Sequence, residues 1–544
     1  MITLLHRLPS GDVELTELDA SGRALGAAVV VADDDWIDEV RRREAATAPR
    51  WAWDDTPRWH PRLLAAGVEV GRCLDLRLCH VILRGSAATV GSELHGAPRG
   101  PWDVPQSAPV ATDALVVVEP ESLPDPLAEL RRQRAAVESS PGRAGLELLL
   151  AAESTGALVA AEMHEAGVPW STEVHDRLLT ELLGPRPATG QRPLAMQHEL
   201  DRVRAALDDP QLNPDSPADL VRSLRRAGIV VSSTRQWELQ QHEHPAIEPL
   251  LRYKKLQRLL VANGWSWLDQ WVHDGRFRPE YVPGGVVTGR WASSGGGALQ
   301  LPKAVRAAVV ADPGHVLVVA DVAQLEPRVL AGLARDGAMA AAGAGDLYEG
   351  IVRSGAVATR QEAKGAMLGA MYGATRGESG RLLPRLARAF PRAMALVEEA
   401  ARTGEQGGVV STLLGRSSPR PGDAAARDAF PPETAGPPVD GDARAWGRFT
   451  RNFVVQGTAA EWALCWLGVL RRRLRAREAA GEGRARLVFF LHDEVVVQAP
   501  DDLADAVADD VREAAVEAGR LVFGEAPLTF PLTVEVVRDY GQAG

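Results

Sequence analysis

The sequence contains few cysteines. Only three of its 544 residues are cysteine, at Cys73, Cys79 and Cys465. They are too few and too irregularly spaced for a disulfide framework or a zinc site. We therefore expect each to be a small, buried apolar side chain.

Long hydrophobic runs are absent as well. No segment approaches the roughly 18 uncharged apolar residues that predict a membrane-spanning helix. The opening residues MITLLHRLPSGDVEL lack the layout of a signal peptide. We therefore expect a soluble cytoplasmic protein with no membrane partner.

Lysine is scarce, and acidic residues outnumber basic ones. Only four of the 61 basic residues are lysine, and the net charge is −11. This balance argues against a protein that simply coats nucleic acid, although enzymes that act on nucleic acid often confine positive charge to one groove. Either the composition has drifted towards arginine, or certain sites favour a compact ammonium group. The four are Lys254, Lys255, Lys303 and Lys364.

The remaining composition is that of ordinary globular domains. Hydrophobic residues make up 45% of the chain and charged residues 24%, and the length suffices for several domains without a visible repeat. The pattern predicts the following order: an α/β unit over 1–85 with strands at 13–18 and 27–32 and a helix at 34–46; a Pro/Gly-rich linker over 96–126 with a strand-like stretch at 114–118; helices across 128–183 and 195–272, one of them at 216–227; a loop at 417–443; a helix at 503–521; and a strand at 532–537.

One short apolar strand ends in an acid. Residues 316–320 follow a Pro-Gly turn and have the pattern of a buried strand, which Asp321 closes. A buried carboxylate is costly unless a partner compensates it, and a bound cation is a common partner. Taken alone, Asp321 is explained more simply as the cap of the next helix.

A second stretch predicts a hairpin with acids at its tip. In residues 487–499, LVFFLHDEVVVQA, two apolar runs meet at His492, Asp493 and Glu494. Two strands that deliver Asp321 and Asp493 to one end of a sheet would let the carboxylates share two divalent ions about 3.5–4 Å apart. A few oxygen ligands suit Mg²⁺, which keeps its other positions for water and substrate phosphates. The pair therefore indicates phosphoryl transfer.

A basic helix follows the first of these strands. Arg360, Lys364, Leu368 and Tyr372 recur at every fourth residue and so form one stripe along the helix. Two cations, an apolar side chain and a phenol in that order would meet a nucleotide lengthwise, phosphates first. The alternative is an amphipathic helix whose cations reach out to solvent.

Other segments could contact nucleic acid. The Gly/Ser-rich loop 284–306 holds Arg290 and Gln300, a composition that alone is a weak signal. Residues 248–270 predict a helix that carries Lys254 and Lys255, and this helix is either a phosphate-binding surface or a solvated face.

A long helix predicted over 444–473 aligns Arg448, Asn452 and Gln456 on one face. Neutral amides on one face are poor core residues and good readers of groove edges.

Taken together, these motifs resemble family A DNA polymerases, the class of bacterial DNA polymerase I, over about residues 145–541. The matching segments occur in the family's order. They are TGR at 288–290 with Gln300, DVAQLEPR at 321–328, R-x3-K-x3-L-G-x2-Y-G at 360–373, RFTRNFVVQGTAAE at 448–461 and HDE at 492–494, with the shorter LLGR at 413–416 and YKKL at 253–256.

The resemblance implies a multidomain α/β fold in which a right-hand polymerase follows a small ribonuclease H-like domain. The implied boundaries are 1–126 for a degenerate exonuclease-like domain and linker, 127–285 for the thumb and connecting helices, 286–345 and 421–544 for the palm, and 346–420 for the fingers. It implies a monomeric DNA-directed DNA polymerase that acts near the nucleoid, in repair or gap filling. Its partners would be primer–template DNA and deoxynucleoside triphosphates, and its cofactor two Mg²⁺ ions, for which Mn²⁺ can substitute.

The resemblance also implies residue roles. Asp321 and Asp493 would hold the metals, and Lys364 would donate a proton to the leaving pyrophosphate. Glu326 would crowd the 2′ position and so select deoxynucleotides. Nucleotide binding would involve Arg360, Lys364, Leu368, Tyr372, Glu326 and Gln324, and DNA binding would involve Arg290, Gln300, Arg448, Asn452, Gln456, His492, Lys254 and Lys255.

The chain departs from the family pattern at several points. Val322 replaces a Tyr, Leu368 replaces the Phe or Tyr that stacks on the incoming sugar, and Ala298 stands where an Asn is common. The segment between Gln300 and Asp321 is also shorter than usual. We expect the metal chemistry to survive, with looser sugar discrimination and lower nucleotide affinity.

The N-terminal part resembles the family's 3′-5′ exonuclease domain through residues 61–83. The acids that such a nuclease needs are missing, because no D-x-E ends the first strand, His60 stands where an Asp is expected and no Y-x3-D precedes residue 145. Asp75 alone remains, and one carboxylate cannot hold two metals. Proofreading is therefore predicted to be absent.

Two other functional classes compete with the polymerase. One is a catalytically weak or inactive primer–template binding protein derived from a polymerase, which Leu368 and Val322 favour and the retained Asp321 and Asp493 oppose. The other is a nuclease acting through residues 1–100, which would need acids that are missing.

Overall fold

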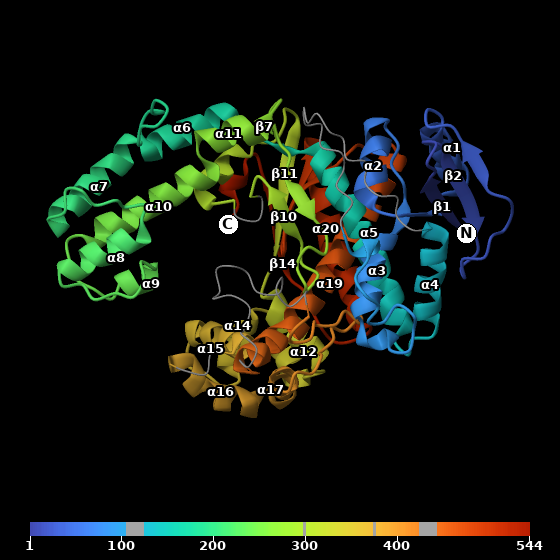
Figure 1. Cartoon of the computed structure of the whole chain (residues 1–544). Helices are drawn as coiled ribbons and strands as arrows, with labels where there is room; N and C mark the ends of the chain where they lie inside the picture. The colour runs from blue at the N-terminus through green and yellow to red at the C-terminus, as the bar shows by residue number, and fades with distance from the viewer. Residues whose placement is uncertain (105–124, 298–300, 374–376, 424–442) are drawn as a thin grey trace. The chain divides into compact units, whose positions relative to one another are not determined.

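The computed structural model describes residues 1–104, 125–297, 301–373, 377–423 and 443–544. They form two compact units, one of residues 1–166, 280–294 and 318–536 and the other of residues 167–279, 295–317 and 537–544 (Figure 1). The predictions for 114–118, Ala298 and Gln300, and most of the predicted loop at 417–443, lie outside the described residues.

The first unit begins with a five-stranded sheet in the order β3-β2-β1-β4-β5. β1 pairs antiparallel with β2 and parallel with β4. The elements of this region are β1 (Ile2–Arg7), β2 (Val13–Leu18), β3 (Val29–Val31), α1 (Trp36–Thr47), β4 (Arg50–Trp53), α2 (Thr56–Ala65), β5 (Arg72–Asp75), α3 (Leu76–Gly85), α4 (Pro126–Glu138) and α5 (Arg143–Ala166), with short 3-10 turns at Ala87–Thr89 and Pro101–Asp103. The mixture of strands and helices predicted over 1–85 is therefore confirmed.

A second sheet of the first unit has the order β12-β13-β11-β14. β12 and β13 form the predicted antiparallel hairpin. The strands are β11 (His315–Val322), β12 (Arg486–Leu491), β13 (Glu494–Pro500) and β14 (Leu532–Val537), and a separate hairpin joins β9 (Glu280–Val282) to β10 (Ala292–Gly295).

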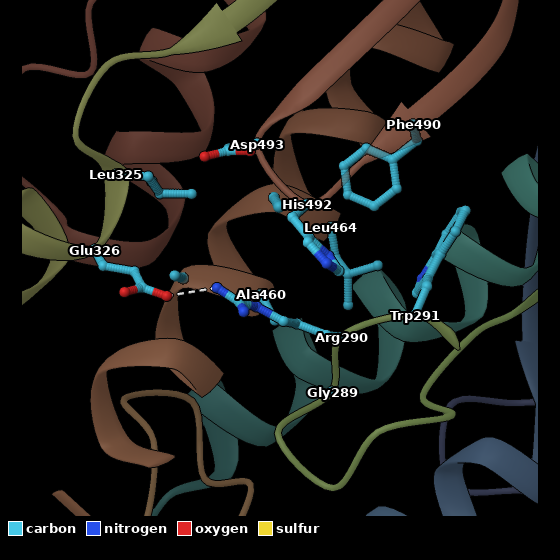
Figure 2. A pocket seen from close by; sticks show the side chains of 12 residues that line it. Gly289, Arg290, Trp291, Leu325, Glu326, Ala460, Leu464, Phe490, His492 and Asp493 are labelled. Carbon is cyan, nitrogen blue, oxygen red and sulfur yellow. Dashed lines mark hydrogen bonds and ion pairs between the residues drawn. The ribbon is translucent and has the colours of Figure 1, made fainter. Parts of the chain in front are cut away.

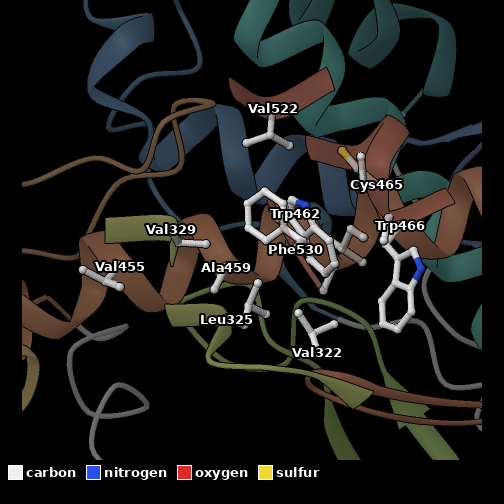
Figure 3. Close-up of a cluster of buried hydrophobic side chains, with 14 of the residues drawn as sticks. Val322, Leu325, Val329, Val455, Ala459, Trp462, Cys465, Trp466, Val522 and Phe530 are labelled. Carbon is white, nitrogen blue, oxygen red and sulfur yellow. The ribbon is translucent and has the colours of Figure 1, made fainter. Parts of the chain in front are cut away.

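One long helix, α19 (Ala443–Ala479), contributes many residues to the hydrophobic core of the first unit. It contacts α5, α17 and α20, and the middle of its sequence is almost entirely buried. Its Trp462 packs on Phe530 with ring centroids 4.8 Å apart (Figure 3). The other helices between and after the strands are α12 (Leu325–Leu333), α13 (Gly337–Ala342), α14 (Leu347–Arg353), α15 (Arg360–Tyr372), α16 (Gly377–Ala389), α17 (Pro391–Glu405) and α20 (Ala504–Phe523), with a 3-10 turn at Asp501–Leu503.

The second unit is mainly helical. A small three-stranded sheet in the order β6-β8-β7 accompanies the helices. Its elements are β6 (Val168–Pro169), α6 (Thr172–Leu183), α7 (Leu194–Leu207), α8 (Pro217–Arg226), α9 (Gln236–Leu239), α10 (Ile247–Asn263), α11 (Trp265–Trp271), β7 (Val272–His273) and β8 (Arg276–Phe277), with 3-10 turns at Lys303–Ala308 and Tyr540–Gln542.

Two predictions for this second unit have different outcomes. Ser216 caps α8 by accepting a hydrogen bond from the Asp219 N–H at 3.3 Å, as its sequence predicts. The single helix predicted over 248–270 is wrong, because Gly264 has an extended backbone that ends α10 before α11 begins.

The cysteines have the environment that the sequence predicts. Cys73, Cys79 and Cys465 are all free and buried.

Two apolar helices are long enough to be compared with membrane spans. By length and composition alone, α5 and α19 could cross a membrane, but 61% and 89% of their most apolar 18-residue stretches are buried inside the fold. Core helices of globular proteins meet the same criterion, so these two are weak evidence for a membrane span.

Candidate active site

The end of β11 lies beside the tip of the β12–β13 hairpin. The N–H of Val322 donates to the backbone carbonyl of Asp493 at 2.9 Å. Burial, and then the negative charge of Asp321, raise the pKa of the Asp493 carboxyl to about 6, because a like charge nearby disfavours ionisation. The structure therefore brings together two acids that are far apart in the sequence.

Asp321 is exposed, and this corrects the expectation of a buried carboxylate there. The apolar residues of β11 are buried on either side of it, whereas the side chain of Asp321 leaves the core. The burial argument for a compensating cation therefore applies to the half-buried Asp493 and not to Asp321.

The backbone at the hairpin tip has an uncommon conformation. Leu491 pairs with Glu494, so His492 and Asp493 are the two turn residues. His492 has φ +55°, in the left-handed region that few residues other than glycine adopt, with asparagine, aspartate and histidine the commonest of these. Such positions persist where the surrounding structure enforces them and are frequent at functional sites.

The two aspartates fit a magnesium site better than a zinc site. Among the described residues, no group of three or more His, Cys, Asp or Glu side chains could hold a metal. An ion at this edge would therefore have two carboxylates as protein ligands. Mg²⁺ accepts few protein oxygens and completes its shell with water and phosphate oxygens, so the donor set suits it.

Arg290 reaches this edge from the β9–β10 hairpin. Its guanidinium donates to Glu326 Oε1 at 2.5 Å (Figure 2). Burial and the charge of Arg290 lower the pKa of His492 to about 4. The imidazole is therefore neutral near pH 7 and can accept a hydrogen bond from a ligand.

A small cavity separates these side chains. It has a volume of about 60 Å³, which suffices for a few water molecules and not for a nucleotide. Its polar lining is Arg290, Glu326, His492 and Asp493, and its apolar lining includes Leu325, Leu464 and Phe490 (Figure 2).

Glu326 links the cavity to helix α15. The hydroxyl of Tyr372 donates to Glu326 Oε2 at 2.8 Å, while Arg290 donates to the other carboxylate oxygen. Burial, and then the charge of Glu326, raise the pKa of the Tyr372 phenol. Donors from two segments therefore fix the orientation of the Glu326 carboxylate.

Helix α15 presents the predicted stripe on its exposed face. Arg360, Lys364, Leu368 and Tyr372 are all exposed, whereas Ala363, Ala366, Met367 and Ala370 are buried. The helix begins at a capping box formed by Thr359 and Glu362 and ends at Gly373, which has φ +76°. Because Tyr372 contacts Glu326, the C-terminal end of the stripe lies at the cavity.

The N-terminal end of the stripe has a partner that the sequence did not indicate. Arg360 donates to Asp346 Oδ2 at 2.9 Å, and its guanidinium carbon lies 5.5 Å from the ring centre of Tyr348. Lys364 has no ion-pair partner among the described residues. Asp346 was missed because it reads as an ordinary helix cap, a role it also fills by accepting from the Glu349 N–H at 2.9 Å.

Helix α19 contributes the predicted amide face. The hydroxyl of Thr288 donates to Gln456 Oε1 at 3.0 Å, which ties this face to the loop that carries Arg290. Asn452 Oδ1 is buried and has no hydrogen-bond partner among the described residues. Arg448 is exposed, and its side chain lies against Gly373 at the end of α15.

Gln324, Lys254 and Lys255 were predicted as site residues but do not line this cavity. The amide of Gln324 donates to Asp346 Oδ2 at 3.1 Å and accepts from the Leu347 N–H at 3.2 Å, so it supports α14. Lys254 belongs to the second unit and donates to the carbonyl of Thr234 at 2.6 Å, while Lys255 is exposed. Gln300 lies outside the described residues.

Val322 does not face this site. Its side chain is buried in the core beneath β11, where it lies near Leu325 and Trp462 (Figure 3). The departure from tyrosine at this position therefore changes the core packing and leaves the cavity lining unchanged. Leu368, with 37% of its surface exposed, is the departure that lies on the stripe.

The acids of the N-terminal domain have partners within the fold. Asp75 is buried and accepts hydrogen bonds from the Thr56 N–H at 2.7 Å and the Leu78 N–H at 2.9 Å. Asp55 pairs with Arg77 at 3.0 Å. His60 Nε2 lies 3.1 Å from Glu162 Oε1. Asp75 therefore caps a helix, and Asp55 and His60 take part in ion pairs.

Comparisons with known proteins show which family the chain resembles. The family model described as DNA polymerase family A matches residues 210–540. The chain is 28% identical over 340 residues to the thermostable DNA polymerase I of Thermus aquaticus, covering 57% of this chain and 38% of that protein. It is 26% identical over 334 residues to the DNA polymerase I of Pseudomonas aeruginosa, covering 55% and 33% respectively. The matches thus span well under half the length of these curated relatives.

A solved structure shows the same fold. It is described as the POL domain of Pol1 from M. smegmatis in complex with DNA primer-template and dNTP. The TM-score is 0.69 at 18% sequence identity, and the match covers 98% of this chain and 93% of that one.

Proposed function

The chain belongs to DNA polymerase family A, and from this premise we propose that it is a template-directed DNA polymerase that adds deoxynucleotides to a primer 3′-hydroxyl. The observation that carries the proposal is the convergence of Asp321 and Asp493 at one sheet edge, where the charge of one raises the pKa of the other. Its partners would be primer–template DNA and deoxynucleoside triphosphates, and we expect it to act in the cytoplasm.

Asp321 and Asp493 would hold two Mg²⁺ ions, for which Mn²⁺ could substitute. Bound divalent cations would make the primer hydroxyl more acidic and stabilise negative charge on the pyrophosphate. In the reaction the 3′-oxygen forms a bond to the α-phosphorus, and the bond from that phosphorus to pyrophosphate breaks. Half-buried Asp493 and exposed Asp321 would offer their carboxylate oxygens to the ions, which would in turn bind the phosphates.

Arg360 and Lys364 would bind the triphosphate along the exposed face of α15. Lys364, which has no ion-pair partner among the residues described, is free to donate a proton to the leaving pyrophosphate. Arg360 must first exchange Asp346 for a phosphate, because its guanidinium donates to that carboxylate in the structure.

The sugar and base would lie towards Tyr372. Glu326, which Tyr372 and Arg290 hold, would exclude a 2′-hydroxyl. Leu368 can pack against the sugar but offers no ring for stacking, so we expect weaker nucleotide binding than an aromatic residue would give.

The primer terminus would contact Arg290, His492 and the amide face of α19. Acceptors in the minor groove are common to all base pairs, so Gln456 and Asn452 could check the shape of a base pair without reading its sequence. Lys254 and Lys255 would contribute phosphate contacts from the second unit, which corresponds largely to the proposed thumb.

We further propose that the protein does not proofread. His60, Asp55 and Asp75 are committed to ion pairs and helix caps, so a two-metal nuclease site is not formed by them. The alternative to the polymerase remains a primer–template binding protein with weak or no catalysis, and Leu368 on the stripe is the observation that favours it.

A primer-extension assay tests the proposal. The wild type should extend a primer with Mg²⁺ or Mn²⁺, whereas Asp321→Asn and Asp493→Asn should lose extension by several orders of magnitude and still bind primer–template in an anisotropy titration. A wild type that binds but never extends would support the binding protein. Extension by both variants would refute the assignment of the two aspartates.

A further inference from the structure

A buried ion pair lies beneath the loop that carries Arg290. Arg416 donates to Glu153 Oε2 at 2.5 Å, and the two side chains are only 9% and 1% exposed. Glu153 comes from α5 and Arg416 from the loop that follows α17, so the pair joins segments 263 residues apart. Burying two charges is costly, and this pair is outside the proposed catalytic edge.

The pair fits against both ends of the β9–β10 loop. Gly284 and Gly289 have φ +62° and +85°, so both are in the region that favours glycine. A Cβ at Gly289 would lie 2.6 Å from Arg416 Nε, and a Cβ at Gly284 would lie 2.7 Å from Glu153 Oε1. The backbone of this loop therefore packs directly against the two side chains of the ion pair.

Other contacts also hold the loop in place. The Gly289 N–H donates to the Val286 carbonyl at 2.8 Å, and Thr288 donates to Gln456. At the base of the hairpin, the rings of Trp291 and Phe490 pack with centroids 5.0 Å apart. Arg290 lies between these anchors, one residue from Gly289.

The turn that carries Arg416 is itself hydrogen-bonded to α19. The N–H groups of Leu413 and Leu414 donate to Thr458 Oγ1 and Glu461 Oε2, each at 3.1 Å. The N–H of Arg416 donates to Thr412 Oγ1 at 2.9 Å. The turn that carries Arg416 is thus hydrogen-bonded to α19, the helix that also carries Gln456.

We propose that the Glu153–Arg416 pair is a positioning element for Arg290, which sets the depth of the β9–β10 loop so that the Arg290 guanidinium meets Glu326 at the nucleotide site. This inference rests on the proposed polymerase function. Arg416 and Glu153 touch no reacting group and act through Arg290. Without the pair, the backbone at Gly284 and Gly289 loses the side chains that it packs against. The loop can then move into the space that those side chains filled.

The kinetic test is a double-mutant cycle. Removing one partner alone would strand a buried charge, so the main variant is Glu153→Met/Arg416→Met, with Arg416→Lys as a milder change. Single-turnover incorporation at saturating nucleotide should fall about tenfold or more in the double variant. The same change in an Arg290→Ala background should cost less than about threefold, because residues that act as one unit are not additive.

A matched control separates positioning from general stability. Glu162→Met/Arg471→Met removes another buried ion pair of α5 and α19, whose side chains are 18% and 6% exposed, without touching the loop. It should lower the melting temperature at least as much, because Arg471 also donates to the carbonyls of Val70 and Gly71, and its effect on incorporation should be the same with or without Arg290. Equal, multiplicative losses for the Glu153/Arg416 variant in both backgrounds would overturn the proposal.

Hydrogen exchange provides a readout that does not need activity. Peptides covering residues 284–291 should exchange faster in Glu153→Met/Arg416→Met than in the wild type and remain unchanged in the Glu162/Arg471 control. A wild type that fails to incorporate nucleotides would defeat the proposed function, and exchange would then decide this inference alone. Unchanged exchange in the Glu153/Arg416 variant would refute it.

Discussion

Arg360 donates to the carboxylate of Asp346 at 2.9 Å, so the cation that we expect to bind the nucleotide triphosphate is neutralised in the structure. The Asp346 carboxylate raises the pKa of the Arg360 guanidinium and also accepts from Gln324. A triphosphate must therefore compete with a fixed carboxylate for this side chain.

Asp346→Asn should strengthen nucleotide binding. Asparagine keeps the helix-capping function at the start of α14 but removes the negative charge. Because an exposed ion pair is weak, we expect the KM for deoxynucleotides to fall by less than about fivefold, with the larger effect at low salt. Steady-state kinetics at two ionic strengths would measure it. In an Arg360→Ala background the change should vanish, and a persistent effect would show that Asp346 acts by another route.

Leu368→Phe should raise nucleotide affinity. Leu368 is 37% exposed on α15, and a ring there could stack on the incoming sugar. We expect a two- to tenfold lower apparent Kd for dATP, roughly the value of one aromatic contact. Single-turnover titrations with dATP, ATP and a dideoxynucleotide would show whether discrimination changes as well. Leu368→Met, which adds no ring, is the matched control and should resemble the wild type.

Glu461→Gln should flatten the dependence of stability on pH. Burial raises the pKa of the Glu461 carboxyl to about 7, well above its value in an unfolded chain. Between about pH 4.5 and about pH 7 the folded state holds the extra proton, so this group favours folding at low pH and its contribution is lost as the pH rises through 7. At pH 8 the variant should gain up to about 3 kcal/mol relative to its difference from wild type at pH 5. Urea titrations across this range would measure the slope, and parallel curves for the two proteins would contradict the assignment.

Arg471→Met should destabilise the first unit. Arg471 donates to both oxygens of Glu162 and to the backbone carbonyls of Val70 and Gly71. Truncation would leave these acceptors buried without a donor, at a cost of about 3–5 kcal/mol. Chemical denaturation would measure the loss. Arg472→Met, on the neighbouring exposed position, should cost less than about 0.5 kcal/mol.

Local sequence patterns predicted much of this structure because they reflect short-range physics. The apolar runs at 316–320, 487–491 and 495–497 were predicted to be strands, and the structure places them in one sheet. The four-residue spacing in α15 predicted one stripe along that helix. The capping residue Ser216 marked the start of its helix. Val322 had to lie opposite Asp321, because neighbouring side chains of a strand point to opposite faces.

Long-range pairs could not be predicted in the same way. A single sequence gives no sign that Glu153 pairs with Arg416 or Glu162 with Arg471, since each pair depends on how distant helices pack. The exposure of Asp321 depends on which strands flank β11, and the end of α10 at Gly264 depends on one residue that helices can also tolerate. The partnership of Asp346 with Arg360 arises from the folding of α14 against α15.

The N-terminal domain also supports the loop from which Arg416 projects. Ser86 donates to the carbonyl of Gly415 at 2.6 Å, and the Ala87 N–H donates to Ser417 Oγ at 2.8 Å. Shortening the protein to begin at α4 would therefore remove both hydrogen bonds from the loop that carries Arg416. A shortened chain that begins at that boundary would need substitutes for these two donors, so residues 86 and 87 contribute to the support of the Arg416 turn.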